Sequence, residues 1–281
     1  MKPDALRKRI RSYEDTYRYM LPPRSVILFR GDGCHFHTLT RSLEKPFDDK
    51  FKAAMDATAM ALCKEISGAA LAYVESDEIS VLVVPYRKYN TEPWFSNGIQ
   101  KMCSVGASIA TAAFNKEMSL EKPATFDMRV FALPREEACN AFIDRQRDCV
   151  RNSILSAGQE YLGKKVVHGL NCTQIVERLG RTRNSWEELD NWKKFGRVVT
   201  KTTYTITNAM KSSIEEMPIL STTIRSKWVV DAATPMFHQD RRQIDYLVWP
   251  EGEEGQYSAP VTGEDKIESL SDIIASADLE S

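Results

Sequence analysis

The order of the apolar segments over residues 25–133 constrains the fold more than any other feature of this 281-residue chain. Short β-branched apolar runs predict strands at residues 25–29, 70–74, 79–84 and 126–133. Longer segments with apolar residues at helical spacing predict helices at 51–66 and 94–114. The resulting order, β-α-β-β-α-β, is the split βαβ arrangement of ferredoxin-like domains, so we expect an α+β fold.

The rest of the chain has a different character. A third helix is predicted over residues 135–162, and only short extended pieces follow, at 197–206 and 227–231. We expect a ferredoxin-like domain over 1–135, a mainly helical portion over 136–250 packed on it, and an acidic, flexible tail over 251–281. The tail holds nine acidic residues and one lysine, so its net charge is −8. Because the net charge of the whole chain is −1, residues 1–250 have a net charge of +7. A moderately basic body suits a polyanionic partner.

Composition excludes several classes of protein. No apolar run approaches the eighteen residues of a membrane span, and the basic N-terminus lacks the apolar core of a secretory signal. Six cysteines lie scattered without a Cys-x-x-Cys pair, which indicates reduced thiols and not a disulfide framework or zinc finger. We therefore expect a cytoplasmic protein that does not enter the membrane.

Two acidic segments far apart in the sequence should converge in the predicted sheet. The first and third strands of a split βαβ sheet lie side by side and antiparallel, so Asp32, just past the first strand, should lie near Asp77 and Glu78 at the start of the third. Clustered carboxylates repel, and hard oxygen ligands with room for water and phosphate select Mg²⁺. The carbonyl of Gly33 could be a further ligand. Taken singly, Gly-Asp-Gly predicts a turn and Ser-Asp-Glu a solvated link.

Other candidates for phosphate contacts have ordinary alternatives. His35 and His37 could suggest zinc, but no cysteine falls at zinc-ligand spacing from them. His37 could donate a hydrogen bond to phosphate, or be a buried structural histidine. Lys45 and Lys101 could contact a triphosphate, or simply be surface residues.

The segment after residue 140 contains possible RNA contacts. Arg145, Arg147 and Arg151 fall within two turns of the third helix, where they could form an RNA-backbone stripe or a solvated face paired with Asp144 and Asp148. The segment "WEELDNWKKFGR" could supply stacking and phosphate contacts, or form a surface helix.

Seven segments, in order over residues 10–235, resemble the tRNA-histidine guanylyltransferase superfamily of 3′-to-5′ polymerases. They are "RGDGCHFHTLTRSLEKPFD", "YVESDEISVLV", "WFSNGIQKMCSVGASIATAAF", "FDMRVFALP", "FIDRQRDCVRNSI", "HGLN" and "SKWVVD". The resemblance implies a polymerase-palm catalytic domain in residues 1–135, in which Asp32, the Gly33 carbonyl and Asp77 bind two Mg²⁺ ions and Glu78 supports them. It also implies that GTP or ATP is held by Cys34, His35, Phe36, His37, Lys45, Ser76 and Lys101. The expected RNA-binding residues are Arg145, Arg147, Arg151, Asn152, Lys193 and Lys194, and the expected assembly is a homo-tetramer.

The chain departs from the family pattern at a few positions. Eukaryotic members have His-Ile-Asn-Asn where this chain has Val150–Ser153, and the present form resembles the bacterial and archaeal branch, which repairs 5′-truncated tRNA. Gly31 replaces a usual apolar residue, and Cys34 replaces a usual Lys or Arg.

The leading hypothesis is a Mg²⁺-dependent nucleotidyltransferase that adds nucleotides in the 3′-to-5′ direction to a tRNA 5′ end. One alternative is a catalytically silent RNA-binding protein on the same fold. Another is a nucleotide cyclase or other palm-fold enzyme, which the RNA-family segments after residue 140 disfavour.

Overall fold

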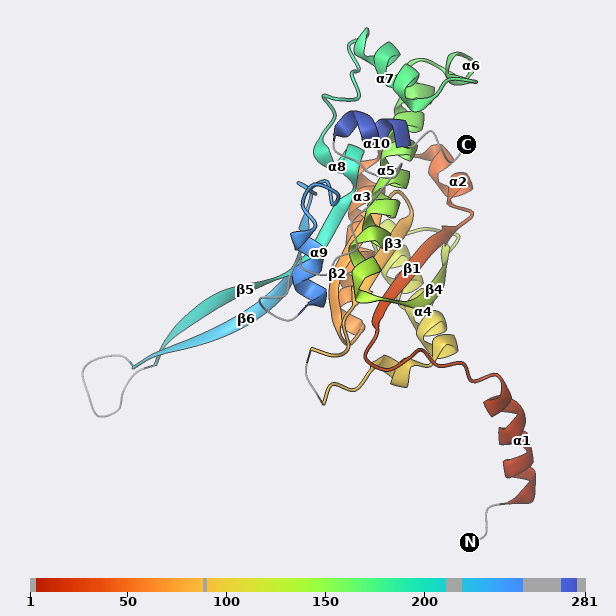
Figure 1. Ribbon diagram of the computed structural model, residues 1–281, viewed down its shortest axis with the longest axis vertical. Coiled ribbons are helices and arrows are strands. Elements are labelled where there is room, and N and C mark those ends of the chain that lie inside the picture. The colour runs from red at the N-terminus through yellow and green to blue at the C-terminus, as the bar shows by residue number, and fades with distance from the viewer. Residues whose placement is uncertain (1–3, 88–89, 211–218, 250–268, 277–281) are drawn as a thin grey trace.

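The computed structural model describes residues 4–87, 90–210, 219–249 and 269–276, and is built on one six-stranded antiparallel sheet. The strand order is β4-β1-β3-β2-β5-β6, and its first four strands have the order of a ferredoxin-like domain, as the sequence predicts (Figure 1). The strands are β1 Val26–Cys34, β2 Ala69–Glu75, β3 Glu78–Val83, β4 Thr125–Leu133, β5 Arg197–Met210 and β6 Ile219–Asp231.

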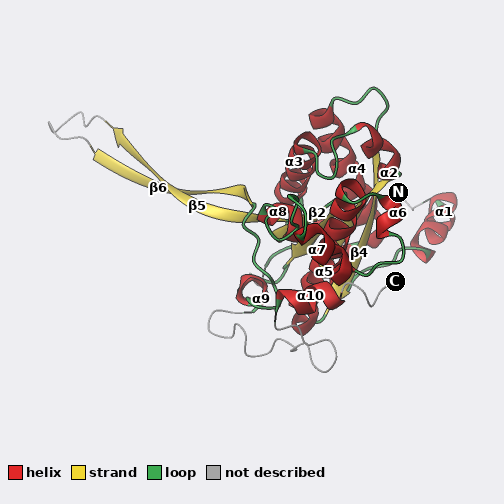
Figure 2. Cartoon of the chain, turned by 90° about the horizontal axis from the view of Figure 1, so that it is seen from above, coloured by secondary structure: helices red, strands yellow, loops and turns green. Residues whose placement is uncertain are grey.

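Helices cover both faces of the sheet, with α3 and α4 on one face and α5 on the other (Figure 2). The described helices are α1 Ala5–Thr16, α2 Phe36–Leu39, α3 Asp49–Glu65, α4 Ile99–Met118, α5 Ala138–Tyr161, α6 Lys164–Val167, α7 Cys172–Gly180, α8 Asn191–Phe195, α9 Arg242–Val248 and α10 Leu270–Ser276. None of these described helices combines the length and apolarity needed to cross a membrane.

Helix α3 begins at Asp49, two residues before the predicted helix at 51–66. The side chain of Asp48 accepts a hydrogen bond from the backbone N–H of Phe51 (2.7 Å), which caps the first turn. Its apolar side, which includes Met55, Ala59 and Leu62, is fully buried against the sheet and α4.

Two predicted boundaries are wrong. Gly-Asp-Gly does not form a turn, because β1 continues through Cys34: it pairs with β3 as far as Asp32 and with β4 as far as Cys34. Helix α4 begins at Ile99 instead of residue 94, since Phe95 and Ser96 have positive φ angles (48° and 53°) that an α-helix cannot contain.

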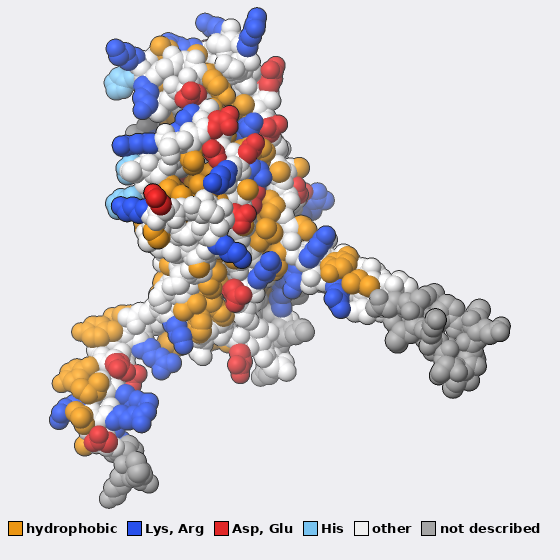
Figure 3. Space-filling view, turned by 180° about the vertical axis from the view of Figure 1, so that it is seen from behind, with side chains coloured by type: hydrophobic (Ala, Val, Ile, Leu, Met, Phe, Trp, Pro, Cys, Tyr) orange, Lys and Arg blue, Asp and Glu red, His pale blue; other side chains and the backbone are white. Residues whose placement is uncertain are grey.

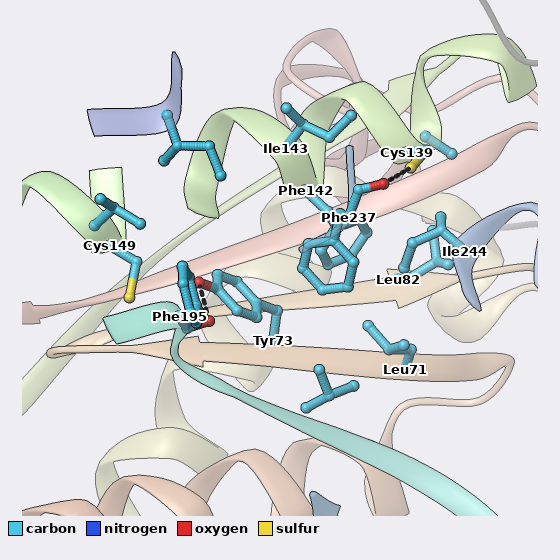
Figure 4. Packing of buried hydrophobic residues seen from close by; sticks show 14 of the residues in the cluster. Leu71, Tyr73, Leu82, Cys139, Phe142, Ile143, Cys149, Phe195, Phe237 and Ile244 are labelled. Carbon is cyan, nitrogen blue, oxygen red and sulfur yellow. Dashed lines mark hydrogen bonds between the residues drawn. The ribbon is translucent and has the colours of Figure 1, made fainter. Parts of the chain in front are cut away.

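The core between the sheet and α5 is apolar at one end of the sheet. Tyr73 packs edge-on against Phe142 and Phe237, and its hydroxyl donates to the carbonyl of Phe195 (2.9 Å; Figure 4). This aromatic cluster fixes α5, α8 and the segment after β6 on the same face of the sheet.

The C-terminal portion is built onto the same sheet. Strand β5 pairs with β2, and β5 and β6 extend together away from the body as a long hairpin (Figure 1). The sheet therefore continues past residue 135, and the domain division there stays a prediction. Within the segment expected to be a flexible tail, α10 buries Ile273 and Ile274 and contacts α5 and α7; residues 251–268 and 277–281 lie outside the described residues, and the tail stays a prediction.

Candidate active site

Strand β1 places Asp32 opposite two other carboxylates. In the strand register, Asp32 pairs with Glu78 of β3 on one side and with Asp127 of β4 on the other. Directly opposed residues in antiparallel strands have Cα atoms about 4.5–5.5 Å apart. Side chains alternate along β1, so Asp32 shares with Leu28 the face that α5 covers. Three neighbouring strands thus bring three carboxylates to one end of that face.

Asp77 joins this group from the turn between β2 and β3. The backbone N–H of Gly33 donates to the carbonyl of Asp77 (3.2 Å), which ties the end of β1 to the turn. The tight connection also forces Ser76 to a positive φ of 42°. The structure therefore brings together Asp32, Gly33, Asp77 and Glu78, as the sequence predicts.

The carboxylates make this end of the sheet electrostatically unfavourable without a cation. Burial raises the pKa of Asp32, and the negative charges of Asp77 and Asp127 raise it further. Burial also raises the pKa of Asp77, although the nearby imidazole of His37 opposes the rise. A bound cation would relieve both the burial and the mutual repulsion.

Glu78 is held by arginines from two directions. Its carboxylate lies 3.6 Å from the guanidinium of Arg30 and 3.6 Å from that of Arg145. Arg145 also pairs with Asp148 (2.5 Å) and Asp144 (2.6 Å), and only 15% of its side chain is exposed. The structure therefore places Arg145 within the carboxylate group at the sheet, where it fixes Glu78.

The turn after β1 is fixed by an aromatic core residue. Phe36 is 1% exposed and packs against Phe51, Phe114 and Phe126, so a ligand could contact only its backbone. His35 has a left-handed conformation (φ 60°) at the start of α2.

The two residues flanking that turn approach the carboxylates. Cys34, at the end of β1, has its Sγ 4.0 Å from the Asp127 carboxylate. His37 lies close enough to Asp77 to influence its pKa.

A cavity of about 220 Å³ lies next to Asp77 and gathers four predicted residues, Lys45, Ser76, Asn152 and Lys193. Its walls come from residues 40–52, the end of β2, the middle of α5, and α8. The cavity is bounded by side chains far apart in the sequence. Ser76, which lines it, directly precedes Asp77, while Asp32, Gly33, Asp77 and Glu78 do not line it.

The outer wall of this cavity is aromatic and cationic. The Trp192 ring has the ammonium groups of Lys52 and Lys193 at 5.5 Å and 5.4 Å from its centroid. Arg197 is buried there and forms an ion pair with Asp56. Lys52 also pairs with Asp56 and Lys193 with Asp190 (both 2.8 Å), so the wall offers a ring for packing and cations that already have carboxylate partners.

Other predicted residues lie elsewhere. Lys101 lies on α4, which covers the opposite face of the sheet from the carboxylates, and its ammonium is 4.7 Å from the centroid of the Phe95 ring. Arg147 lies near His238 and lowers the pKa of that imidazole, an effect second to burial. The ammonium of Lys194 donates to the carbonyl of Glu187 (2.6 Å).

Arg151 is a further predicted residue, and it is partly buried on α5. Roles in RNA or nucleotide binding for these residues stay predictions.

Two acidic residues at the site, Asp127 and Glu75, were not predicted from the sequence. Asp127 alternates with apolar residues in "FDMRVF", which identifies its face but not its partner across the sheet. Glu75 is 3% exposed at the cavity, and burial raises its pKa well above the usual range. Its burial has no clear sequence signal, because the polar "ESDE" segment resembles a solvated link.

The donor set fits Mg²⁺ better than a closed metal cage. Among the described residues, no three His, Cys, Asp or Glu side chains form a group that could hold a metal alone. Mg²⁺ is usually bound by one or two carboxylates together with water and substrate phosphates. The juxtaposition of Asp32 with Asp77, both with raised pKa values, meets that requirement.

Comparison with known proteins gives consistent results. A family model described as tRNAHis guanylyltransferase matches residues 7–134. The solved structure of a bacterial tRNA(His) guanylyltransferase (Thg1)-like protein in complex with ATP is 37% identical, covers 87% of this chain and 99% of that one, and superposes with a TM-score of 0.77. One in complex with GTP is 37% identical, with coverages of 88% and 100% and a TM-score of 0.73. An uncharacterized protein of Acanthamoeba polyphaga mimivirus is 26% identical over 235 residues, which are 73% of this chain and 80% of that protein.

Proposed function

Because the chain belongs to the tRNAHis guanylyltransferase family and is a nucleotidyltransferase, we propose that it adds nucleotides in the 3′-to-5′ direction to the 5′ end of a tRNA, with Mg²⁺. The observation that carries this proposal is the meeting of Asp32 and Asp77 next to Ser76, which lines a cavity whose walls include Lys45, Lys52 and Lys193 together with Glu44, Asp48 and Glu75. The family match and the ATP and GTP complexes of similar bacterial proteins support tRNA and nucleoside triphosphates as substrates.

The metal ligands in this proposal are Asp32, the Gly33 carbonyl and Asp77. Bound Mg²⁺ would supply positive charge to the reacting phosphates. Glu78, fixed by Arg30 and Arg145, supports this end of the sheet without leaving its ion pairs.

The reaction has two displacements at phosphorus. Where the RNA ends in a monophosphate, an oxygen of that phosphate attacks the α-phosphorus of ATP or GTP, and pyrophosphate leaves. The 3′-hydroxyl of the incoming nucleotide then attacks the 5′-terminal phosphorus of the RNA opposite a template base, and the activating nucleoside monophosphate leaves. Where the RNA already carries a 5′-triphosphate, pyrophosphate leaves in this step. Catalysis depends mainly on positioning and on neutralising charge.

The cavity beside Asp77 would hold a nucleotide. Lys45 and Lys193 supply positive charge at its wall, and Ser76 and Asn152 supply hydrogen-bonding groups. Trp192 offers a ring on which a base or ribose can pack. We expect a homo-tetramer that acts in the cytoplasm, and both expectations rest on the family resemblance.

The test is incorporation of labelled nucleotides into a 5′-truncated tRNA. Asp32→Asn and Asp77→Asn should each abolish incorporation with the fold intact, while Glu160→Gln, an exposed carboxylate on α5, should match the unchanged protein. Full activity in either aspartate variant would overturn the metal assignment. RNA binding that persists in EDTA, with no incorporation from any nucleotide mixture, would instead identify a silent RNA-binding protein.

A further inference from the structure

Glu75, the last residue of β2, is a buried carboxyl at the wall of the cavity. Side chains alternate along a strand, so Glu75 shares with Leu71 and Tyr73 the face that α5 covers. Its side chain lines the cavity, and the residue is only 3% exposed. Its Oε2 atom makes no hydrogen bond with any of the described residues. A buried acceptor without a donor is uncommon in folded proteins and calls for an explanation.

The donors around the cavity are engaged elsewhere. Three of the four basic residues that line it pair with other carboxylates: Arg197 and Lys52 with Asp56, and Lys193 with Asp190. The fourth, Lys45, is exposed. The Tyr73 hydroxyl donates to the backbone carbonyl of Phe195 (2.9 Å). Figure 3 shows basic and acidic side chains mixed in the same way over the α3 and α4 side of the body. Because these donors have other acceptors, Oε2 of Glu75 is available to a ligand.

A ligand that satisfies Glu75 must bring a hydrogen-bond donor. The phosphates of a nucleotide are anionic acceptors, so its donors are the amino group of the base and the hydroxyls of the ribose. Trp192 lines the same cavity and offers a ring for packing. Arg197 lies 5.7 Å from the centroid of that ring, and in the sheet it pairs with Val74, the residue before Glu75. A base that packs on Trp192 therefore lies in the part of the cavity that contains Glu75.

We propose that Glu75 is a specificity-determining residue, which accepts a hydrogen bond from the exocyclic amino group of a purine base in the cavity. The inference rests on the proposed function, because it takes the ligand to be the ATP or GTP of that reaction. One unpartnered oxygen accepts one donor, and the amino group of adenine or of guanine supplies it. A base without an amino group leaves Oε2 buried and unpaired, so the cavity selects against that base.

The first experiment measures nucleotide binding by isothermal titration calorimetry, with Mg²⁺ and without RNA, so that no transfer occurs. Inosine triphosphate is GTP without the amino group, and purine riboside triphosphate is ATP without it. At least one analogue should bind about ten- to a hundredfold more weakly than its parent nucleotide, the loss expected for one hydrogen bond to a buried carboxyl. The pair that shows the loss identifies the base. Equal affinities within both pairs would overturn the proposal.

Substitution of Glu75 tests whether this residue carries the preference. Glu75→Met keeps the length of the side chain without the acceptor, so it should bind parent and analogue alike. Glu75→Gln keeps one acceptor oxygen and should restore part of the preference, which a purely structural role would not do. Glu160→Met, the same change at an exposed carboxylate of α5, should leave the preference unchanged. A folded Glu75→Met protein with the full preference would contradict the assignment, and the analogue comparison on the unchanged protein needs no variant to fold.

The ribose is the competing source of a donor. Binding of 2′-deoxy-GTP and 2′-deoxy-ATP, each compared with its parent nucleotide, should differ by the same factor in the unchanged protein and in Glu75→Met. A loss that disappears in Glu75→Met would assign Glu75 to the ribose and overturn the base assignment.

Incorporation assays keep this inference separate from the proposed function. A Glu75-dependent preference for the amino group in a protein that incorporates no nucleotide would contradict the proposed function alone. Incorporation by a protein without that preference would contradict this inference alone. A protein that binds neither ATP nor GTP would overturn both.

Discussion

The two halves of strand β1 pair with the same neighbouring strands, β3 and β4, but carry different kinds of side chain. The whole of β1 pairs with β4 without interruption, and Ile27–Asp32, which span both halves, also pair with β3. The side chains of the first half are 0–2% exposed and pack into the apolar cores on both faces of the sheet. In the second half, the residues on the α5 face are Arg30, Asp32 and Cys34 instead of large apolar residues. The hydrogen-bond ladder therefore sets position at both ends, and the side chains alone divide the strand into a stabilising half and a half suited to chemistry.

The largest expected effect separates activity from stability at the polar half. Asp32→Asn should lower nucleotide incorporation by about a thousandfold or more, because a metal ligand lowers the activation free energy by several kcal/mol. The same variant should unfold at an equal or higher temperature without metal, since it removes a charge that burial and two neighbouring carboxylates disfavour. Incorporation assays and thermal unfolding in EDTA measure the two effects. A large loss of stability would show that Asp32 belongs to the structural half.

The reverse result is expected at the apolar half. Leu28 lies four residues earlier on the same face and is 2% exposed. Leu28→Ala should lower the free energy of unfolding by about 2–5 kcal/mol, because it leaves a cavity beneath α5. Activity per folded molecule should change little below the unfolding transition, as urea denaturation combined with incorporation assays can show. Loss of activity in a protein that remains folded would mean that the two halves are coupled.

Two glycines in the polar half should respond differently to the same added methyl group. A Cβ at Gly33 would lie 2.4 Å from the ring of Phe36, which is held on several sides in the core. A Cβ at Gly31 would meet the terminal methyl of Met128 at 2.9 Å, and that flexible end can move. We expect Gly33→Ala to destabilise by about 1–3 kcal/mol and Gly31→Ala by less. Equal losses in urea denaturation would contradict this account of why Gly33 is glycine.

The comparison also shows which parts of the site follow from sequence. The strand order and the meeting of Asp32 with Asp77 could be predicted, because antiparallel neighbours bring the end of one strand to the start of the next. The continuation of β1 through Gly-Asp-Gly could not, since local propensity favours a turn and pairing with both neighbours overrides it. Asp127 required the register between β1 and β4.

The inward direction of Arg145 was hidden for a similar reason. Basic residues spaced along a helix are compatible with a solvent-facing stripe and with buried ion pairs, and only the carboxylates of the facing sheet decide between them. The cavity was hidden because its walls come from separate segments of the chain.

The smallest expected effect concerns the dependence of stability on pH and Mg²⁺. Asp32 and Asp77 have pKa values raised above 3.8, so the folded state holds their protons more tightly than the unfolded state does. Their contribution to stability is therefore fully present below pH 3.8 and is lost as the pH rises through the folded pKa values.

The double variant Asp32→Asn, Asp77→Asn cannot lose stability in this way. Its free energy of unfolding should therefore rise relative to that of the unchanged protein as the pH rises from about 4 to 7 in EDTA. Mg²⁺ should reverse the order at pH 7, because binding at ten times the dissociation constant stabilises the folded state by about 1.4 kcal/mol. Urea denaturation of both proteins at several pH values, with EDTA or Mg²⁺, measures the effect. An equal gain from Mg²⁺ in the double variant would place the ion elsewhere and leave the polar half of β1 without its cation.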